Sequence, residues 1–398
     1  MPLRPPPEDV RETMSDLETT REILGSLISH PTVSSESNLD LMWVMADRLD
    51  RAGARVEVMK DASGAKANLF ATIGPDEPGG LMLSGHSDVV PVEDQPWSAD
   101  PFAMWEDEGR LFGRGTCDMK GFIAATLAMA PIYATLPLKR PIHFAFTHDE
   151  ETGCIGAQSL VRDLQERGIK PSIAIIGEPT SMKIIEGHKG CCEYTTSFQG
   201  LEGHGSAPDR GVNAAEYTVR YVTRLMELRE EMKSRAPANS RFDPPWTTMN
   251  VGRLSGGFAH NVIVGKAEVE WEFRPVQESD FTYFKTQIAA YANDTLLPAM
   301  RAVHPDAKIT TETKGEVAGL EPMKDNEARD LVARLTGQNG ADVVAFGTEA
   351  GLWQAMGMSA IVCGPGSIEQ AHKADEFVEA SQLQACLDML YGLGQKLT

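Results

Sequence analysis

Residues 141–180, PIHFAFTHDEETGCIGAQSLVRDLQERGIKPSIAIIGEPT, decide the fold class because they contain three successive elements of alternating type. PIHFAF (141–146) and SIAIIG (172–177) are short apolar runs typical of buried strands. GAQSLVRDLQERG (156–168), between them, has the periodicity of an amphipathic helix. A strand, a helix and a strand in this order predict two parallel strands joined by a covering helix.

The same alternation continues on both sides of this segment. Further predicted strands are ANLFATIG (67–74), GLMLSG (80–85), ADVVAF (341–346) and SAIVCG (359–364). Further predicted helices include residues 17–30, 38–52, 121–133 and 326–337 and a final helix at the C-terminus. The sequence therefore predicts an α/β fold whose catalytic domain has a mostly parallel sheet with covering helices on both faces.

The pattern changes between Lys189 and Pro298, where long alternating strands and two amphipathic helices replace the short apolar strands. We expect an α+β domain inserted at residues 189–298. The catalytic domain then consists of residues 16–188 and 299–398. Residues 1–15, rich in proline and acidic residues, are predicted to be disordered.

The charge balance limits the class of partner. A formal net charge of −20 over 398 residues argues against nucleic-acid binding, because no basic stripe is present to neutralise phosphates. Six cysteines without CxxC spacing favour reduced thiols over a disulfide scaffold. No apolar run has the length of a membrane span, and the N-terminus lacks the apolar core of a secretory signal. We expect a cytoplasmic protein that acts on a small molecule.

Metal-ligating side chains follow the apolar strands of the predicted sheet. They are His86 and Asp88 after residues 80–85, Asp149, Glu150 and Glu151 after 141–146, Glu178 after 172–177, and His372 after 359–364. Asp118 lies among glycines ahead of a predicted helix. Ligands bind beyond the carboxyl ends of strands in open α/β sheets, so we expect these residues to meet at one sheet edge.

Ligand counting favours two metal ions over one. A catalytic zinc takes about three protein ligands and leaves a position for water. A set of about five suits two divalent ions roughly 3.5–4 Å apart if one carboxylate bridges them. One carboxylate of the triplet 149–151 would then bind a cation, and its neighbour would stay unligated as a base. The alternatives are a solvated acidic turn and a metal-dependent binding protein without catalysis.

Five motifs in this order and spacing resemble the M20 metallopeptidase and deacylase family: GHSDVVP, GRGTCDMKG, HDEETG, GEPT and AHKADEF. The resemblance runs from about Leu17 to the C-terminus. GEPTSMK, GHKG, FGTEAGL and VCGPGSIEQAHKADEF are most similar to the acetylornithine deacetylase branch, which serves arginine biosynthesis. The resemblance implies two zinc ions per chain, for which cobalt can substitute.

The resemblance also implies the metal ligands. Asp118 would bridge both ions, with His86 and Glu178 completing one site and Glu151 and His372 the other. The peptide bond after Asp118 is expected to be cis, as in relatives.

Two further roles follow from the resemblance. Asp88 would orient the imidazole of His86, and Glu150 would be the general base. On the residues alone, the base and the ligand among Glu150 and Glu151 stay interchangeable, because neighbouring loop residues face either way.

The inserted domain resembles the lid and dimerisation domain of the family. His204, in GLEGHGSAP, would reach the active site of the partner subunit in a homodimer and stabilise the oxyanion; the alternative is a turn histidine. Asn261 and Arg274 would bind substrate, the arginine through the α-carboxylate, although a surface ion pair also explains Arg274. Charge complementarity suggests Glu349 as the partner of a substrate ammonium, with a structural role as the alternative.

The predicted reaction is hydrolysis of the amide bond of an N-acyl amino acid, with N2-acetyl-L-ornithine as the expected substrate. Three residues around Asn261 depart from the acetylornithine deacetylase pattern: Phe258, His260 and Val264. The alternative is therefore another M20 amidohydrolase: an N-acyl-amino-acid deacylase, a succinyl-diaminopimelate desuccinylase, or a carboxypeptidase or dipeptidase.

Overall fold

The computed structural model describes residues 16–398, which divide into two compact units. Within the described range, the first unit comprises residues 16–186, 322–342 and 352–398, and the second comprises residues 187–321 and 343–351. The predicted disorder of residues 1–15 lies outside the described residues.

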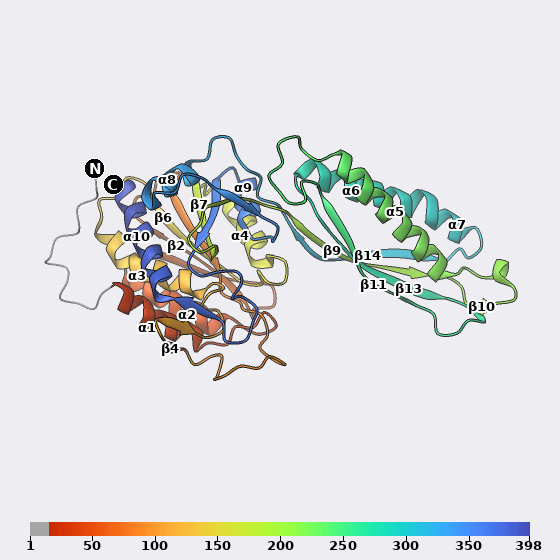
Figure 1. Cartoon of the computed structure of the whole chain (residues 1–398), viewed down its shortest axis with the longest axis horizontal. Helices are drawn as coiled ribbons and strands as arrows, with labels where there is room; N and C mark the ends of the chain where they lie inside the picture. Colours follow the sequence, from red (N-terminus) through yellow and green to blue (C-terminus); the bar gives the residue numbers. More distant parts are fainter. Residues whose placement is uncertain (1–15) are drawn as a thin grey trace. The chain divides into compact units, whose positions relative to one another are not determined.

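An eight-stranded sheet forms the centre of the first unit (Figure 1). In spatial order its strands are β1 (Arg55–Lys60), β2 (Ala67–Ile73), β6 (Ile142–Thr147), β3 (Leu81–His86), β7 (Ile173–Pro179), β16 (Ser359–Gly364), β8 (Ile185–His188) and β15 (Asp342–Val344). The four central strands β6, β3, β7 and β16 are parallel. β1 and β2 on one side and β8 on the other pair antiparallel. The predicted α/β class is confirmed, with antiparallel strands added outside a parallel centre.

Helices cover both faces of this sheet because its strands are apolar on both faces. Among residues 16–398, six helices lie wholly in this unit: α1 (Asp16–Ile28), α2 (Leu39–Arg51), α3 (Lys120–Thr135), α4 (Ile155–Glu166), α8 (Glu327–Thr336) and α10 (Ala380–Lys396). A seventh, α9 (Ala350–Ala355), begins in residues that group with the second unit. Leu69 of β2 belongs to a hydrophobic cluster that includes residues of α1, α2, α3, α8 and α10. The adjacent Asn68 faces the other way and donates to the carbonyl of Gly156 in α4, at 2.9 Å.

Helix α3 is buried along most of its length and starts next to the predicted metal ligand Asp118. Its N-terminal turn packs closely on the end of β7: a Cβ added at Gly177 would lie 1.8 Å from the Phe122 ring. The buried Lys120 donates to the carbonyls of Leu27 (3.1 Å) and His30 (2.9 Å) at the end of α1. These contacts fix the start of α3 against the sheet.

A small three-stranded sheet lies in the same unit, in the order β17 (Phe377–Glu379), β5 (Arg110–Phe112) and β4 (Trp105–Asp107). Its antiparallel pairing sets Phe377 opposite Phe112, so the chain after His372 runs beside the chain before Asp118. This small sheet therefore brings two predicted ligand loops together.

The second unit is built on an antiparallel sheet in the order β11 (Thr248–Gly256), β13 (Lys266–Arg274), β9 (Cys191–Gln199) and β14 (Lys308–Val317). Helices α5 (Ala214–Ser234) and α6 (Glu278–Ala290) lie along one face, followed by a π-helical segment, Tyr291–Leu296, and α7 (Leu297–Arg301) (Figure 1). Trp271, Phe273 and Phe284 form aromatic contacts in the core between the sheet and these helices.

The predicted return to the catalytic domain at residue 299 is too early. β14 still belongs to the sheet of the second unit and pairs with β9 from Lys308↔Gln199 to Val317↔Cys191. Residues 343–351 also group with the second unit. The boundary was missed because β14 is an edge strand of mainly polar residues, buried only at Val317, and so lacks a clear apolar alternation.

Two expectations concern the whole chain. Within residues 16–398, no helix is both long and apolar enough to cross a membrane. The six cysteines all lie in this range, and no disulfide joins any of them.

Candidate active site

The predicted ligands converge at the carboxyl ends of the parallel strands. His86 is the last residue of β3, Asp149 to Glu151 follow β6, and Glu178 is the second-last residue of β7. Asp118 immediately precedes α3, and His372 lies in the loop between β16 and β17. The structure brings five of these residues into one cluster: His86, Asp118, Glu151, Glu178 and His372.

Asp118 lies at the centre of this cluster and uses its two carboxylate oxygens differently. Its Oδ1 is 3.0 Å from His86 Nε2, which is 3.7 Å from Glu178 Oε1. Its Oδ2 is 3.3 Å from His372 Nε2, which is 3.2 Å from Glu151 Oε1. Each oxygen of one buried aspartate therefore faces a separate histidine–glutamate pair.

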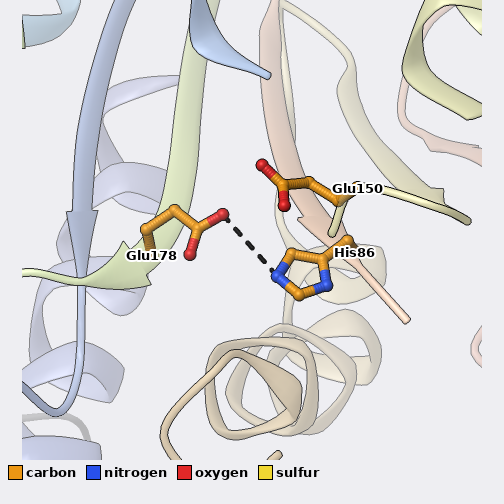
Figure 2. A group of neighbouring side chains, drawn as sticks. All are labelled: His86, Glu150 and Glu178. Carbon is orange, nitrogen blue, oxygen red and sulfur yellow. Dashed lines mark ion pairs between the residues drawn. The ribbon is translucent and has the colours of Figure 1, made fainter. Parts of the chain in front are cut away.

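Glu150 lies beside the first of these pairs. Figure 2 shows Glu150 and Glu178 approaching the His86 imidazole from two sides. Ligand atoms of these three residues lie within 4.8 Å of one another, as do those of His86, Asp118 and Glu151. Glu150 accepts a weak hydrogen bond from the Cys154 thiol at 3.4 Å and has no ion pair with either imidazole among the contacts described.

The crowded carboxylates attract positive charge. Hydrogen bonds to Asp118 and Glu151 raise the pKa of His372 to about 10. Burial opposes a charge on His86, but hydrogen bonds to Asp118 and Asp88 raise its pKa well above the usual value. Burial, reinforced by neighbouring carboxylates, raises the pKa of Glu150 to about 8. Such a cluster is stabilised by cations placed among its carboxylates.

The tautomer of His86 is set by its other ring nitrogen. His86 Nδ1 lies 2.9 Å from the backbone carbonyl oxygen of Asp88 and 3.5 Å from that residue's carboxylate. A carbonyl only accepts hydrogen bonds, so Nδ1 carries the proton of the neutral ring, and in that neutral form the Nε2 lone pair faces Asp118 and Glu178. Asp88 orients the imidazole mainly through its backbone.

The Asp88 carboxylate instead fixes the acidic loop. Its Oδ1 accepts from the Glu150 N–H at 3.1 Å, and its Oδ2 accepts from the Glu151 N–H at 3.3 Å and from the Ser34 hydroxyl at 2.7 Å. The backbone of both glutamates is therefore held in place. Their side chains have different partners: Glu150 contacts the Cys154 thiol, and Glu151 contacts His372.

The remaining acid of the triplet, Asp149, has partners outside the cluster. Asp149, which has a left-handed backbone (φ +55°), forms an ion pair with Lys66 and lies 3.2 Å from His148 Nδ1. Only Glu150 and Glu151 remain directed at the cluster. Like charges are tolerated side by side because each of the three carboxylates has a different environment.

The donor set suits divalent metal ions. Imidazole nitrogens and carboxylate oxygens are the ligands of catalytic zinc and related ions, and Asp118 offers one oxygen to each side. The expected cis peptide bond after Asp118 is present. His372 has a left-handed backbone (φ +61°), a costly conformation for a residue other than glycine that often marks a functional site.

Comparison with known proteins identifies the family. Residues 82–396 match the family described as Peptidase family M20/M25/M40. The chain belongs to this family. It is accordingly a metal-dependent amidohydrolase or peptidase, which confirms the predicted class of enzyme.

Several known proteins are similar to this M20 enzyme. It is 34% identical over 376 residues to an acetylornithine deacetylase of Shigella sonnei, covering 93% of this chain and 95% of that protein. Its fold is similar to that of an M20 metallo-carboxypeptidase, Sso-CP2, from Sulfolobus solfataricus, with a TM-score of 0.73, 15% identity, and coverage of 97% and 99%. It is also similar to the YXEP protein of Bacillus subtilis, described as a dinuclear metal-binding peptidase of this family, with a TM-score of 0.63, 15% identity, and coverage of 96% and 98%.

The second unit of the M20 enzyme carries the remaining predicted residues. His204 ends the short strand β10 (Gly203–His204), which pairs with β12 (Val262–Ile263). The N–H of Gly205 donates to the Asn261 carbonyl at 2.8 Å, so His204 and Asn261 lie close together, and both are exposed.

The hydrogen bonds of His204 determine which of its ring nitrogens carries the proton. Its Nδ1 accepts the backbone N–H of Ser206 at 3.2 Å, so the neutral ring carries its proton on Nε2. The Ser206 hydroxyl lies 2.7 Å from the same Nδ1. A turn histidine held in this way presents an N–H donor to its surroundings.

The two other predicted substrate-binding residues, Arg274 and Glu349, lie in different surroundings. Arg274 forms an ion pair with Glu272 at 2.9 Å, the alternative considered for it from the sequence. Glu349 is fully buried immediately before α9, and its neighbour Thr348 lies 3.0 Å from His188 Nε2. These surroundings involve no substrate, so the substrate-binding roles of Arg274 and Glu349 stay predictions.

Sequence reasoning missed the residues that support the cluster. Ser34 and Lys66 have no distinguishing pattern, so the sequence offered no signal for them. Glu376, by contrast, lies in the AHKADEF motif that supplied His372, and its carboxylate accepts hydrogen bonds from the loop of Asp118. An acid directly before a short strand in that motif was the available signal.

Proposed function

We propose that this M20 enzyme hydrolyses the amide bond of an N-acyl amino acid, with N2-acetyl-L-ornithine as substrate and L-ornithine and acetate as products. The proposal rests on the position of Asp118 in the cluster. One of its carboxylate oxygens faces the pair His86 and Glu178, and the other faces the pair His372 and Glu151. The 34% identity to an acetylornithine deacetylase supports the choice of substrate.

Two divalent ions, zinc or in its place cobalt, fit the cluster. His86, Glu178 and Asp118 Oδ1 would hold one, and His372, Glu151 and Asp118 Oδ2 the other. The dinuclear relative from Bacillus subtilis supports this number. Bound ions would polarise the substrate carbonyl and acidify a water molecule.

Glu150 is the general base of the proposed reaction. It lies against the His86 and Glu178 side of the cluster, whereas Glu151 pairs with His372. The Glu150 carboxylate takes a proton from the attacking water as the oxygen bonds to the carbonyl carbon. It returns that proton to the nitrogen as the C–N bond breaks, which releases a carboxylic acid and an amine; the acid then gives its proton to the amine, so the products are a carboxylate and an ammonium ion.

His204 stabilises the oxyanion in the proposed reaction. The Nε2–H that follows from the Ser206 bond is a donor suited to developing negative charge. His204 and Asn261 are exposed on the chain that carries them, which fits a role in the active site of a second subunit.

Substrate recognition uses charged groups of the second unit. The Arg274 guanidinium, now paired with Glu272, binds the α-carboxylate of the substrate bidentately, with Asn261 as a further contact. Glu349 is assigned to the side-chain ammonium of ornithine on charge complementarity.

The homodimer would form through the second unit. Val219 and Met226 are seven residues apart on α5, so they share one helix face, and they are 55% and 41% exposed. Leu254, 48% exposed, lies on β11, an edge strand with an unpaired side. Val219→Glu combined with Met226→Lys should yield monomers by light scattering. Unchanged dimers would exclude this face.

A second candidate is a deacylase or peptidase of the same family with another substrate. Phe258 is 82% exposed and stands with His260 and Val264 around Asn261, where it alters the predicted substrate-binding surface. The test is turnover of N-acetylornithine, N-succinyl-diaminopimelate, N-acetylmethionine and simple dipeptides by the zinc- and cobalt-loaded enzyme. N-acetylornithine should have the highest kcat/KM. A higher value for another compound would replace the substrate and keep the reaction class.

A further inference from the structure

The Glu376 carboxylate lies in a buried network that the proposed reaction does not use. Its side chain is 1% exposed. Its Oε1 accepts backbone N–H bonds from three residues of one loop: Gly115 (3.0 Å), Cys117 (2.9 Å) and Asp118 (3.0 Å). The loop that ends in Asp118 is therefore wrapped around a single oxygen atom.

The other oxygen of Glu376 binds a buried arginine. Arg114 Nη1 donates to Oε2 at 2.7 Å, and both side chains are 1% exposed. Arg114 also donates to the Lys373 carbonyl at 3.3 Å and to Gln95 Oε1 at 2.5 Å. Gln95 Nε2 in turn donates to the His372 carbonyl at 3.1 Å. One network thus joins the backbones of Asp118 and His372.

The charge state of Glu376 follows from its partners. Backbone N–H groups and a guanidinium are donors only, so both carboxylate oxygens accept and the group is ionised. A buried ion pair is weak evidence for a stabilising role, because well-packed apolar residues of similar volume often stabilise a protein as much. A role in fixing the position of neighbouring groups is better matched to this geometry.

We propose that Glu376, paired with Arg114, is a positioning residue that holds Asp118 so that its two carboxylate oxygens face the two histidine–glutamate pairs. It acts through the backbone N–H groups of residues 115–118 and, through Arg114 and Gln95, keeps the His372 loop in register with them. The inference rests on the proposed function, because it requires those pairs to hold divalent ions.

Glu376→Gln tests the proposal. An amide offers one oxygen and one NH2 group, so it cannot accept from the loop and from Arg114 together. The Kd for Zn²⁺ or Co²⁺ should rise about 10- to 100-fold. The visible absorption of the cobalt-loaded protein should change, because the geometry around the ion changes. Kd is measured by chelator competition at a temperature where circular dichroism shows the variant folded.

The matched control is Glu379→Gln, three residues along the same segment. Glu379 is half exposed and 4.0 Å from Arg110, so wild-type Kd and spectrum are expected. A merely structural role of Glu376 would lower the melting temperature of the metal-free protein and leave Kd and spectrum unchanged. A Kd within about twofold of wild type in folded Glu376→Gln overturns the proposal.

If Glu376→Gln does not fold, a second variant tests the proposal. Gln95 is partly exposed, and Gln95→Leu removes both of its bonds to the network. A rise of about threefold or more in Kd supports the proposal, and an unchanged Kd overturns it. A wild-type protein that binds neither ion would overturn the proposed function and this inference with it, and that result is read before any variant is made.

Discussion

The two units differ in how their predicted functional side chains are held. In the first, His86, Asp118 and Glu178 are buried and contact one another. In the second, His204 and Asn261 are exposed, and their contacts are local, as in the bond from Ser206 to the His204 ring. The first set forms a contiguous cluster within its own unit, whereas the second set is proposed to act in the active site of a second subunit.

This contrast separates metal binding and the proposed general base, both in the first unit, from the proposed oxyanion and substrate contacts of the second unit. The ligand cluster needs only the first unit, so metal affinity should be insensitive to substitutions in the second. Oxyanion stabilisation and substrate binding are assigned to the second unit, so changes there should alter rates and leave metal content intact. The predictions for Glu150, His204 and Ser206 test this division, and the prediction for His143 tests a buried histidine outside the cluster.

The largest effect is expected from Glu150→Gln. Loss of the base should lower kcat about 1,000-fold or more, because proton transfer in the transition state is removed. Metal content, measured by plasma mass spectrometry, should stay near the wild-type value. Loss of metal together with activity would instead make Glu150 a ligand and reverse its assignment with Glu151.

His204→Ala should lower kcat by about 100- to 1,000-fold, the usual effect of removing an oxyanion donor. Metal content and melting temperature should not change, because the side chain is exposed. His304→Ala, in the same unit, is the control and should be active. Mixed dimers of His204→Ala and Glu150→Gln chains should regain activity, and inactive verified heterodimers would exclude action across subunits.

His143 lies outside the cluster, and its pKa is lowered, whereas the pKa values of His86 and His372 in the cluster are raised. It is buried, lies 2.9 Å from the Thr72 hydroxyl, and burial lowers its pKa to about 4 from 6.5. The unfolded chain therefore binds more protons below pH 6.5. The contribution of His143 to stability is complete above that pH and is lost as the pH falls toward 4.

The variant His143→Gln should lose less stability than wild type between pH 7 and pH 5, by about 1–2 kcal/mol. Urea unfolding at several pH values measures this difference. Parallel curves for the two proteins would show that His143 does not bring about the acid sensitivity. His304→Gln, a partly exposed site, is the control and should parallel wild type.

The smallest effect is expected for Ser206→Ala. The substitution removes the hydroxyl 2.7 Å from His204 Nδ1 but keeps the backbone N–H that selects the tautomer. We expect a two- to fivefold drop in kcat, on the order of 0.5–1 kcal/mol, with KM unchanged. A loss as large as that of His204→Ala would make the hydroxyl essential for orienting the ring.

The sequence predicted the fold class and most elements, because strands and helices differ in apolar period and the βαβ order implies a parallel sheet. It failed at β14, a polar edge strand, where no period marks the pairing with β9. Side-chain chemistry at strand ends pointed to His86, Glu178 and the acidic triplet 149–151, whereas the choice of Glu151 as a ligand came only from the family resemblance. The small sheet β4, β5 and β17, too short to show a period, was not foreseen.

By itself the sequence determined which residue types reach one edge of the sheet, because side chains that follow parallel strands must emerge there. Only the tertiary structure decided which partner each side chain contacts. Asp149 pairs with Lys66, Glu151 contacts His372, and Asp118 faces both histidines of the cluster. The direction of a side chain in a loop follows no repeating sequence pattern, unlike that of a side chain in a strand or helix. It depends on partners far along the chain, such as Asp88 and Glu376, whose distances no linear pattern encodes.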